Sequence, residues 1–427
     1  MTDQDGRSVR EIAWSEIFPW LLLARCFRIA IQVRLLALGG VGLFLTLLGW
    51  IAIGQVFSGN PRVEREVGQY DECPWLAATE RFPWTGNQWV DPDRSLQPDT
   101  GMLPRLHNSD WETVAGWRGP FWRTWEPLWS TWEFLGRPFQ RIYLGQASPA
   151  ELAFYLLCGL WTILVWGFFG GAMTRAAAYQ LTTEERLGTG AALRFAAKQW
   201  RSYFAGPIIP LLGLFFVGLG VSVLGLLLSF DASVIVAGIL WPLALIGGVL
   251  LALLFFGLFL GWPLLWGSVS SDGPDSFEAI GRAYNYTYQR PLHYLFYATV
   301  AALLGAIGWA AVQAFFTVLL GLTNWAAAWW VGQERFTSVV FGPLDLQSAR
   351  GIGAVVLRFW IECVKLLAVG YLFSYFWSAT AGIYLLMRRQ VDAVELDEVF
   401  LEDESQEPPM PLPPVRPEPE TKPEEPE

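Results

Sequence analysis

Histidine and cysteine are scarce in this chain, and their scarcity excludes most enzyme chemistries. Of 427 residues only two are His and four are Cys. The sequence contains no HExxH, no GxSxG with a partner His, no phosphate-binding loop and no cysteine pair with metal-ligand spacing. We therefore expect no catalytic residue, no cofactor and no metal ligand, and the cysteines are too few and too scattered for a disulfide framework.

Charged residues are also scarce, at 16% of the chain against 53% hydrophobic residues. Six stretches of at least 22 residues contain no charge at all. A helix needs ~20 apolar residues to cross a bilayer core of ~30 Å, and continuous runs indicate helices and not a barrel. We predict an all-α polytopic membrane helix bundle of about six transmembrane helices with interfacial amphipathic helices. The stretches are Leu35–Phe57, Leu152–Met173, Phe204–Phe230, Val234–Val269, Tyr294–Leu322 and Leu366–Met387.

The formal charge of −10 belongs to the end of the chain. Residues 391–427 hold thirteen Asp and Glu against Arg416 and Lys422, so the rest of the chain is nearly neutral. This Pro-rich acidic tail is too poor in apolar residues to fold, and we predict it to be disordered and cytoplasmic. The other predicted divisions are a cytoplasmic amphipathic segment 1–34, a first transmembrane helix 35–57, an extracytoplasmic Trp-rich insertion 58–148 and a five-helix remainder 149–390.

Basic residues in the short connections predict the orientation. They cluster in residues 174–203 and 270–291 and at 388–389, on the same side as the basic N-terminal segment. Because cytoplasmic loops carry such an excess, we predict an inner-membrane protein with both termini in the cytoplasm. The mixed segment Trp14–Val33 favours an amphipathic helix on the inner membrane face, with an extension of the first span as the alternative.

Two segments leave alternatives open. The run 234–269 would reach ~54 Å as one helix, so we favour a tilted or projecting helix over a re-entrant hairpin. In the outer insertion, four tryptophans share one helical face, which favours an anchor in the headgroup layer over an aromatic ligand cleft. These are Trp122, Trp125, Trp129 and Trp132.

Small residues four apart predict close helix packing. The pairs Gly167/Gly171 and Gly257/Gly261 each precede a helix with similar apolar spacing, which indicates either an internal duplication or coincidence. In the last span, four small residues recur along one face and predict a groove for a neighbouring helix. They are Gly370, Ser374, Ser378 and Gly382.

Two groups of charged residues are candidates for a polar or docking site. Arg358, Glu362 and Lys365 share a helical face, and charges inside a membrane point to function. We favour a solvated i,i+4 pair with a snorkelling lysine at the outer interface, because a complete span follows it. Arg282 and Arg290 lie in a cytoplasmic loop rich in tyrosine, which favours an interfacial linker helix over a docking surface for anionic lipid or a protein partner.

Several of these motifs resemble known membrane proteins. The sequences Arg175-Ala-Ala-Ala-Tyr, Ala191-Ala-Leu-Arg-Phe-Ala and Ala205-Gly-Pro-Ile-Ile-Pro look like uncharacterised bacterial multi-pass proteins. They are also distantly similar to the six-helix membrane domain fused to some glycerophosphodiester phosphodiesterases. The resemblance covers roughly residues 150–390 and implies a helical membrane domain. The phosphodiesterase activity needs paired His and carboxylate ligands that this chain lacks.

The leading functional prediction is a non-enzymatic membrane scaffold or partner-binding protein. Its partners would be the lipid bilayer and a protein bound through the cytoplasmic helices or the tail, with no nucleic acid. A permease or channel-like subunit for a small molecule or lipid is the alternative, and a membrane-embedded enzyme comes third. The oligomeric state is left open by the sequence.

Overall fold

The computed structural model describes residues 18–61, 63, 131–142, 148–340 and 348–394. Every regular element in these ranges is helical, which confirms the all-α class. Six helices are long: α3 (Val33–Val56), α8 (Pro149–Thr183), α10 (Trp200–Leu226), α11 (Val234–Asp272), α13 (Pro291–Val331) and α15 (Ala349–Val391). The shorter ones are α2 (Leu22–Ala30), α9 (Thr189–Lys198), α12 (Ser276–Gln289) and α14 (Gln333–Val340), with 3-10 turns η1 (Pro19–Leu21), η3 (Leu227–Ser229) and η4 (Asp231–Ser233).

Among the described residues, five helices are long and apolar enough to cross a membrane: α3, α8, α10 with its extension to Ser229, α11 and α13. The chain is therefore a multi-pass membrane protein by the length and composition of its helices. The sixth predicted span, 366–387, lies inside α15, which is not among the five. It mixes apolar residues with Tyr, Ser and Thr, and nearly all of it is buried by other helices. A membrane crossing by α15 stays a prediction.

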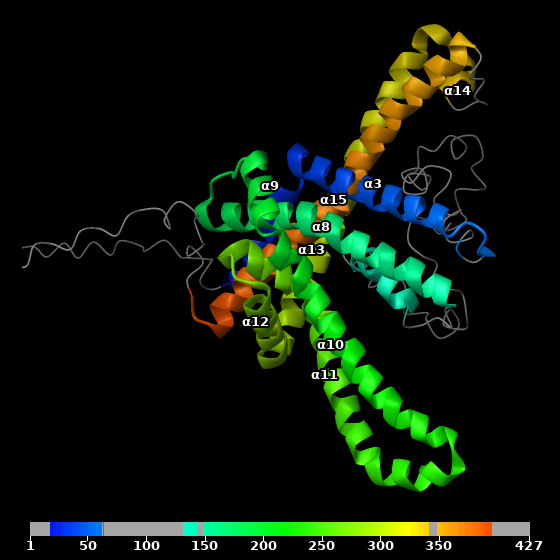
Figure 1. Ribbon diagram of the computed structural model, residues 1–427. Helices are drawn as coiled ribbons and strands as arrows, with labels where there is room; N and C mark the ends of the chain where they lie inside the picture. Colours follow the sequence, from blue (N-terminus) through cyan, green and yellow to red (C-terminus); the bar gives the residue numbers. More distant parts are fainter. Residues whose placement is uncertain (1–17, 62, 64–130, 143–147, 341–347, 395–427) are drawn as a thin grey trace, which may run out of the picture.

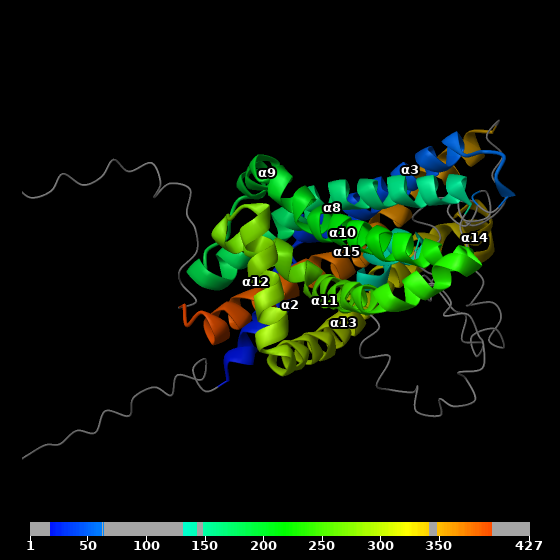
Figure 2. The same cartoon turned by 60° about the horizontal axis from the view of Figure 1, so that its bottom comes forward.

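The long helices converge at one end of the molecule and separate toward the other (Figure 1). The α10–α11 hairpin points one way, α13 with the first half of α15 points another, and α3 and α8 run side by side in a third direction. Figure 2 shows α9 and α12 at the converging end and α14 at the opposite end. We call these the α9/α12 end and the α14 end.

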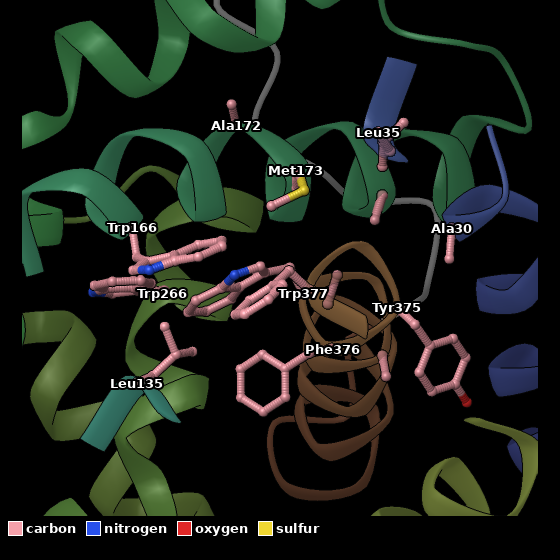
Figure 3. Packing of buried hydrophobic residues seen from close by; sticks show 14 of the residues in the cluster. Ala30, Leu35, Leu135, Trp166, Ala172, Met173, Trp266, Tyr375, Phe376 and Trp377 are labelled. Carbon is pink, nitrogen blue, oxygen red and sulfur yellow. The ribbon is translucent and has the colours of Figure 1, made fainter. Parts of the chain in front are cut away.

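Helix α15 forms the centre of the converging end. From Lys365 to Arg388 nearly all of its residues are buried, because α2, α3, α8, α11 and α13 pack around it. Figure 3 shows Trp377 of α15 beside Trp166 of α8 and Trp266 of α11. The ring centroids of Trp266 and Trp377 are 4.7 Å apart and the rings are stacked. Such aromatic pairs add to the stabilisation by burial, so this cluster joins three helices in one core.

Residues 131–142 form a helix within the bundle. The ring of Trp132 lies 4.5 Å from that of Phe259 in α11, and Phe134 lies 5.6 Å from Phe373 in α15. Part of the predicted outer insertion therefore packs among the long helices. Trp132 is half-buried against Phe259, and its expected place in the headgroup layer stays a prediction. The other three tryptophans of its stripe, Trp122, Trp125 and Trp129, lie outside the described residues.

Helix α2 is separate from α3, because Gln32 is extended between them. This agrees with the amphipathic interpretation of the N-terminal segment. Its apolar face, however, is covered by protein: Leu23 and Cys26 are fully buried and meet Gly382 of α15. This face of α2 therefore packs against other helices and not against a membrane surface.

Helix α11 is one continuous helix of 39 residues, so the re-entrant hairpin is not formed. At 1.5 Å per residue it is about 58 Å long, far more than a bilayer core. Pro242 and Pro263 lie inside it without ending it. Its last residues, together with α12, extend the bundle beyond the length that a perpendicular span needs.

Candidate functional site

A network of paired charges joins α11, α12 and α15 at the α9/α12 end. Its centre is Asp272, the last residue of α11, after which Gly273 takes a left-handed conformation (φ 68°) and ends the helix. One oxygen of Asp272 accepts from Arg388 Nη1 at 2.5 Å, and the other accepts from the Tyr384 hydroxyl at 2.6 Å and from Arg282 Nη1. One carboxylate is thus shared by two guanidinium groups. We call Asp272, Glu278, Arg282, Tyr384 and Arg388 the inner polar network.

Helix α12 presents Arg282 to this carboxylate. The side chain of Asp275 accepts from the backbone N–H of Glu278 at 2.9 Å, which begins the helix as its sequence predicts. Glu278 Oε1 lies 2.5 Å from Arg282 Nη2, the expected i,i+4 pair. Burial disfavours the charged Arg282, but the Tyr384 hydroxyl and Asp272 together raise the pKa of its guanidinium above the ordinary value.

A second contact between α12 and α15 lies beside the network. The hydroxyl of Tyr286 donates to Asp392, and its ring lies 5.6 Å from that of Tyr384. Burial, with Tyr384 and Asp392 nearby, raises the pKa of Tyr286 above its usual range. Tyr286 therefore stays protonated and remains a hydrogen-bond donor at neutral pH.

Arg175 is a buried cation at this end, and sequence reasoning placed it only in a basic loop. It is 4% exposed and donates from Nη1 to the carbonyl oxygens of Ser270 and Ser271, at 2.8 and 3.4 Å. These carbonyls belong to the last turn of α11, where a cation is favourable. The guanidinium also lies 4.3 Å from the ring centre of Phe195 in α9. The sequence signal that could have identified Arg175 as a buried residue was its position within an otherwise uncharged run.

The other sequence candidates lie elsewhere. Arg290 is exposed at the junction of α12 and α13. Lys365 Nζ lies 2.7 Å from Glu362 Oε1, with side chains 3% and 12% exposed, while Arg358 donates to the carbonyl of Val340. The prediction of a solvated pair is therefore wrong in its exposure, since Glu362 is only 12% exposed and Lys365 is enclosed by neighbouring helices.

The depth of Lys365 follows from the packing of α3 on α15. A Cβ on Gly39 would meet the carbonyl of Gly370 and one on Gly40 would meet Leu366, so the two helices are antiparallel. Lys365 comes before Gly370 in α15 and therefore lies beside a later, more central part of α3. The ion pair of Lys365 with Glu362 is inside the bundle and far along α15 from the inner polar network.

The predicted packing residues lie at helix contacts. Gly171 faces the ring of Tyr203 in α10, and Gly257 faces the ring of Tyr284 in α12. Ser374 donates to the carbonyl of Ala30 at 2.8 Å. The remaining members meet Tyr203 (Gly167), Thr287 (Gly261), Leu36 (Gly370) and Cys26 (Gly382), and Ser378 is fully buried. The two GxxxG pairs thus meet different kinds of neighbour, one a long helix and the other a short one.

The corresponding alanines of the two halves of the proposed repeat are all buried. Ala192 and Ala196 of α9 are buried, as are Ala279 and Ala283 of α12. Both short helices pack at the same end of the bundle (Figure 2). An internal duplication stays a prediction, because similar burial follows from similar apolar spacing alone.

Within the part of the chain that the structure describes, no three His, Cys, Asp or Glu residues are grouped as metal ligands. Comparison with protein-family models, curated proteins and solved structures finds no match to this chain.

Proposed function

We propose that this protein is a non-enzymatic membrane protein that binds another membrane helix through its α10–α11 hairpin. The hairpin projects from the bundle (Figure 1) and leaves its apolar sides exposed. Phe216 is 63% exposed and Ile239 is 73% exposed. Lipid tails could cover such surfaces, so exposure alone does not distinguish lipid from protein.

The observation that carries the proposal is the placement of glycine on these exposed surfaces. A Cβ built on Gly220, Gly238 or Gly248 would meet nothing within 4 Å. Packing against the described residues therefore does not require these glycines, although each weakens a helix by roughly 1 kcal/mol relative to alanine. Small residues on exposed transmembrane faces permit close approach by a second helix.

The test is photocrosslinking in the native membrane. A photoreactive residue at Phe216 is expected to give a protein adduct of defined mass, because a partner helix would lie beside it. Gly248→Leu should abolish this adduct without lowering thermal stability, since the site is open. A photoreactive residue at Leu48 of α3, which is 47% exposed, is the control and should capture lipid only. Lipid adducts alone at Phe216 would refute the partner-binding role.

The buried pair of Lys365 and Glu362 favours a permease as the second candidate. Ionisable groups within membrane helices commonly mark transport paths. If the pair belongs to such a path, reconstituted vesicles should show ion or proton flux that Lys365→Gln reduces at least tenfold. Equal flux through both proteins would remove this candidate.

We also propose that the α9/α12 end faces the cytoplasm of a bacterial inner membrane. Arg186, Arg194, Arg201, Arg290 and Arg389 all belong to this end. The excess of basic residues in its short connections supports this orientation.

A further inference from the structure

An apolar groove runs between α8 and the corner where α9 meets α10. Its volume is about 410 Å³, within the range of ligand pockets, roughly 300–1,000 Å³. Leu164 and Phe168 of α8 form one wall, and Ala197, Trp200 and Phe204 form the other. Leu164 is 46% exposed and Trp200 is 49% exposed, so the groove opens on the outside of the bundle.

Two cations are close in the chain to Trp200, which lines this groove. Lys198 and Arg201 are exposed on either side of Trp200, and the Arg201 guanidinium lies 5.9 Å from the centre of a Trp200 ring. Arg194 is exposed one turn before Lys198. No Asp or Glu occurs in residues 189–230, so this segment carries positive charge alone.

We propose that the groove binds an anionic phospholipid, with an acyl chain along α8 and the phosphate at Arg201 and Lys198. An apolar groove, with the Arg201 guanidinium near the ring of its lining residue Trp200, matches the two parts of this ligand. Arginine binds phosphate oxygens through two parallel N–H donors, and tryptophan is favoured at the depth of lipid headgroups. Basic sites at the cytoplasmic surface attract anionic headgroups in the same way.

A protein partner would not need an apolar groove combined with neighbouring cations. The groove is lined by apolar side chains and has Arg201 beside one of them, whereas the two helices of the α10–α11 hairpin expose an open apolar surface. The lipid site is independent of the proposed partner-binding role, because it uses the other end of α10.

The experiment places the full-length protein in nanodiscs of phosphatidylcholine with a trace of photoreactive phosphatidylglycerol, the diazirine being on the acyl chain. Labelled peptides are then mapped by mass spectrometry. Labelling should concentrate on residues 163–169 and 197–204 and exceed that by a photoreactive phosphatidylcholine. Lys198→Ala and Arg201→Ala should each reduce it about fivefold, the effect expected for one interfacial cation.

Two further variants complete the test. Arg290→Ala removes an exposed cation from the same end but away from the groove, and it should change labelling less than twofold. Ala197→Phe fills the groove from an exposed position and should prevent labelling while Lys198 and Arg201 remain. Thermal unfolding of each variant should match wild type.

Equal labelling by the two lipids, or equal losses in Arg290→Ala and Arg201→Ala, would overturn the proposal. Equal labelling by the two lipids would mean that the groove contacts surrounding lipid without selecting its headgroup. Equal losses in the two variants would mean that the overall surface charge, and not this groove, attracts the anionic lipid. Photocrosslinking at Phe216 reports on the partner role separately, so failure of either proposal is distinguishable from failure of the other.

Discussion

Asp272 is the residue that joins the two arginines of the inner polar network. Its carboxylate is within reach of Arg282 and Arg388, which come from two helices that do not follow each other in the chain. With its side chain 15% exposed, the carboxylate is poorly hydrated and needs both guanidinium groups. The network therefore determines how α12 and α15 are oriented on the end of α11.

Asp272→Asn should lower the free energy of unfolding by roughly 2–4 kcal/mol. Removing one member of a fully buried pair costs ~3–5 kcal/mol, and water screens part of this effect because Arg282 is 32% exposed. Unfolding in detergent measures the change. Asp231→Asn, at the exposed turn between α10 and α11, is the matched control and should lie within about 0.5 kcal/mol of wild type. Equal stability of both variants would show that the network contributes nothing.

At the scale of helices, the contact of α3 with α15 brings two backbones together. A Cβ on Gly370 would lie 2.2 Å from the carbonyl oxygen of Leu36, closer than any real contact, and the obstacle is backbone and not a movable side chain. Only glycine permits this approach. The alignment of α15 on α3, and hence the depth of Lys365, depends on it.

Gly370→Ala should therefore destabilise the protein by about 1–3 kcal/mol, because the two helices must separate. The control is Gly353→Ala in the same helix, where nothing lies within 4 Å of the new methyl group. That variant should be neutral or slightly stabilising, since alanine favours helix. The measurement is the melting temperature of the two variants in parallel thermal unfolding. A similar melting temperature for both would contradict the close contact of α3 with α15.

At the scale of the whole molecule, the helices are tightly packed where they converge and are separated from one another farther along. The aromatic core, Arg175 and the inner polar network all lie where the helices converge, whereas the far half of the α10–α11 hairpin is mostly exposed. We expect the converging end to be the more stable part, because local stability follows buried contacts. The separated apolar arms are surfaces for lipid or for another protein.

The orientation of the molecule is tested by single cysteines at four exposed positions. Gly188, Asn285 and Gln390 should be protected from an impermeant maleimide added outside intact cells, while Gly332 should react. All four should react after permeabilisation. Labelling of Gln390 from outside would show that α15 does not cross the membrane. Labelling of Gly188 or Asn285 from outside would show that the proposed orientation is wrong.

The sequence by itself determined the helices and many of their ends. Uncharged runs specify the long apolar helices, because a backbone in hydrocarbon must satisfy its own hydrogen bonds. Local signals specify helix ends: Asp275 begins α12, and Pro291 is the first residue of α13. Spacing also identified small residues such as Gly370 as positions for close packing. All of these follow from interactions within a few residues of the chain.

The tertiary structure alone decided which helices meet. Periodicity identifies a face but not its neighbour, so nothing local to Lys365 indicated its enclosure, and nothing local to Trp132 indicated a place beside α11. Arg175 became a cap for α11 only because α8 passes beside the last turn of α11. Contacts between residues about a hundred positions apart depend on the packing of the whole bundle, and the order of residues along one helix does not contain that information.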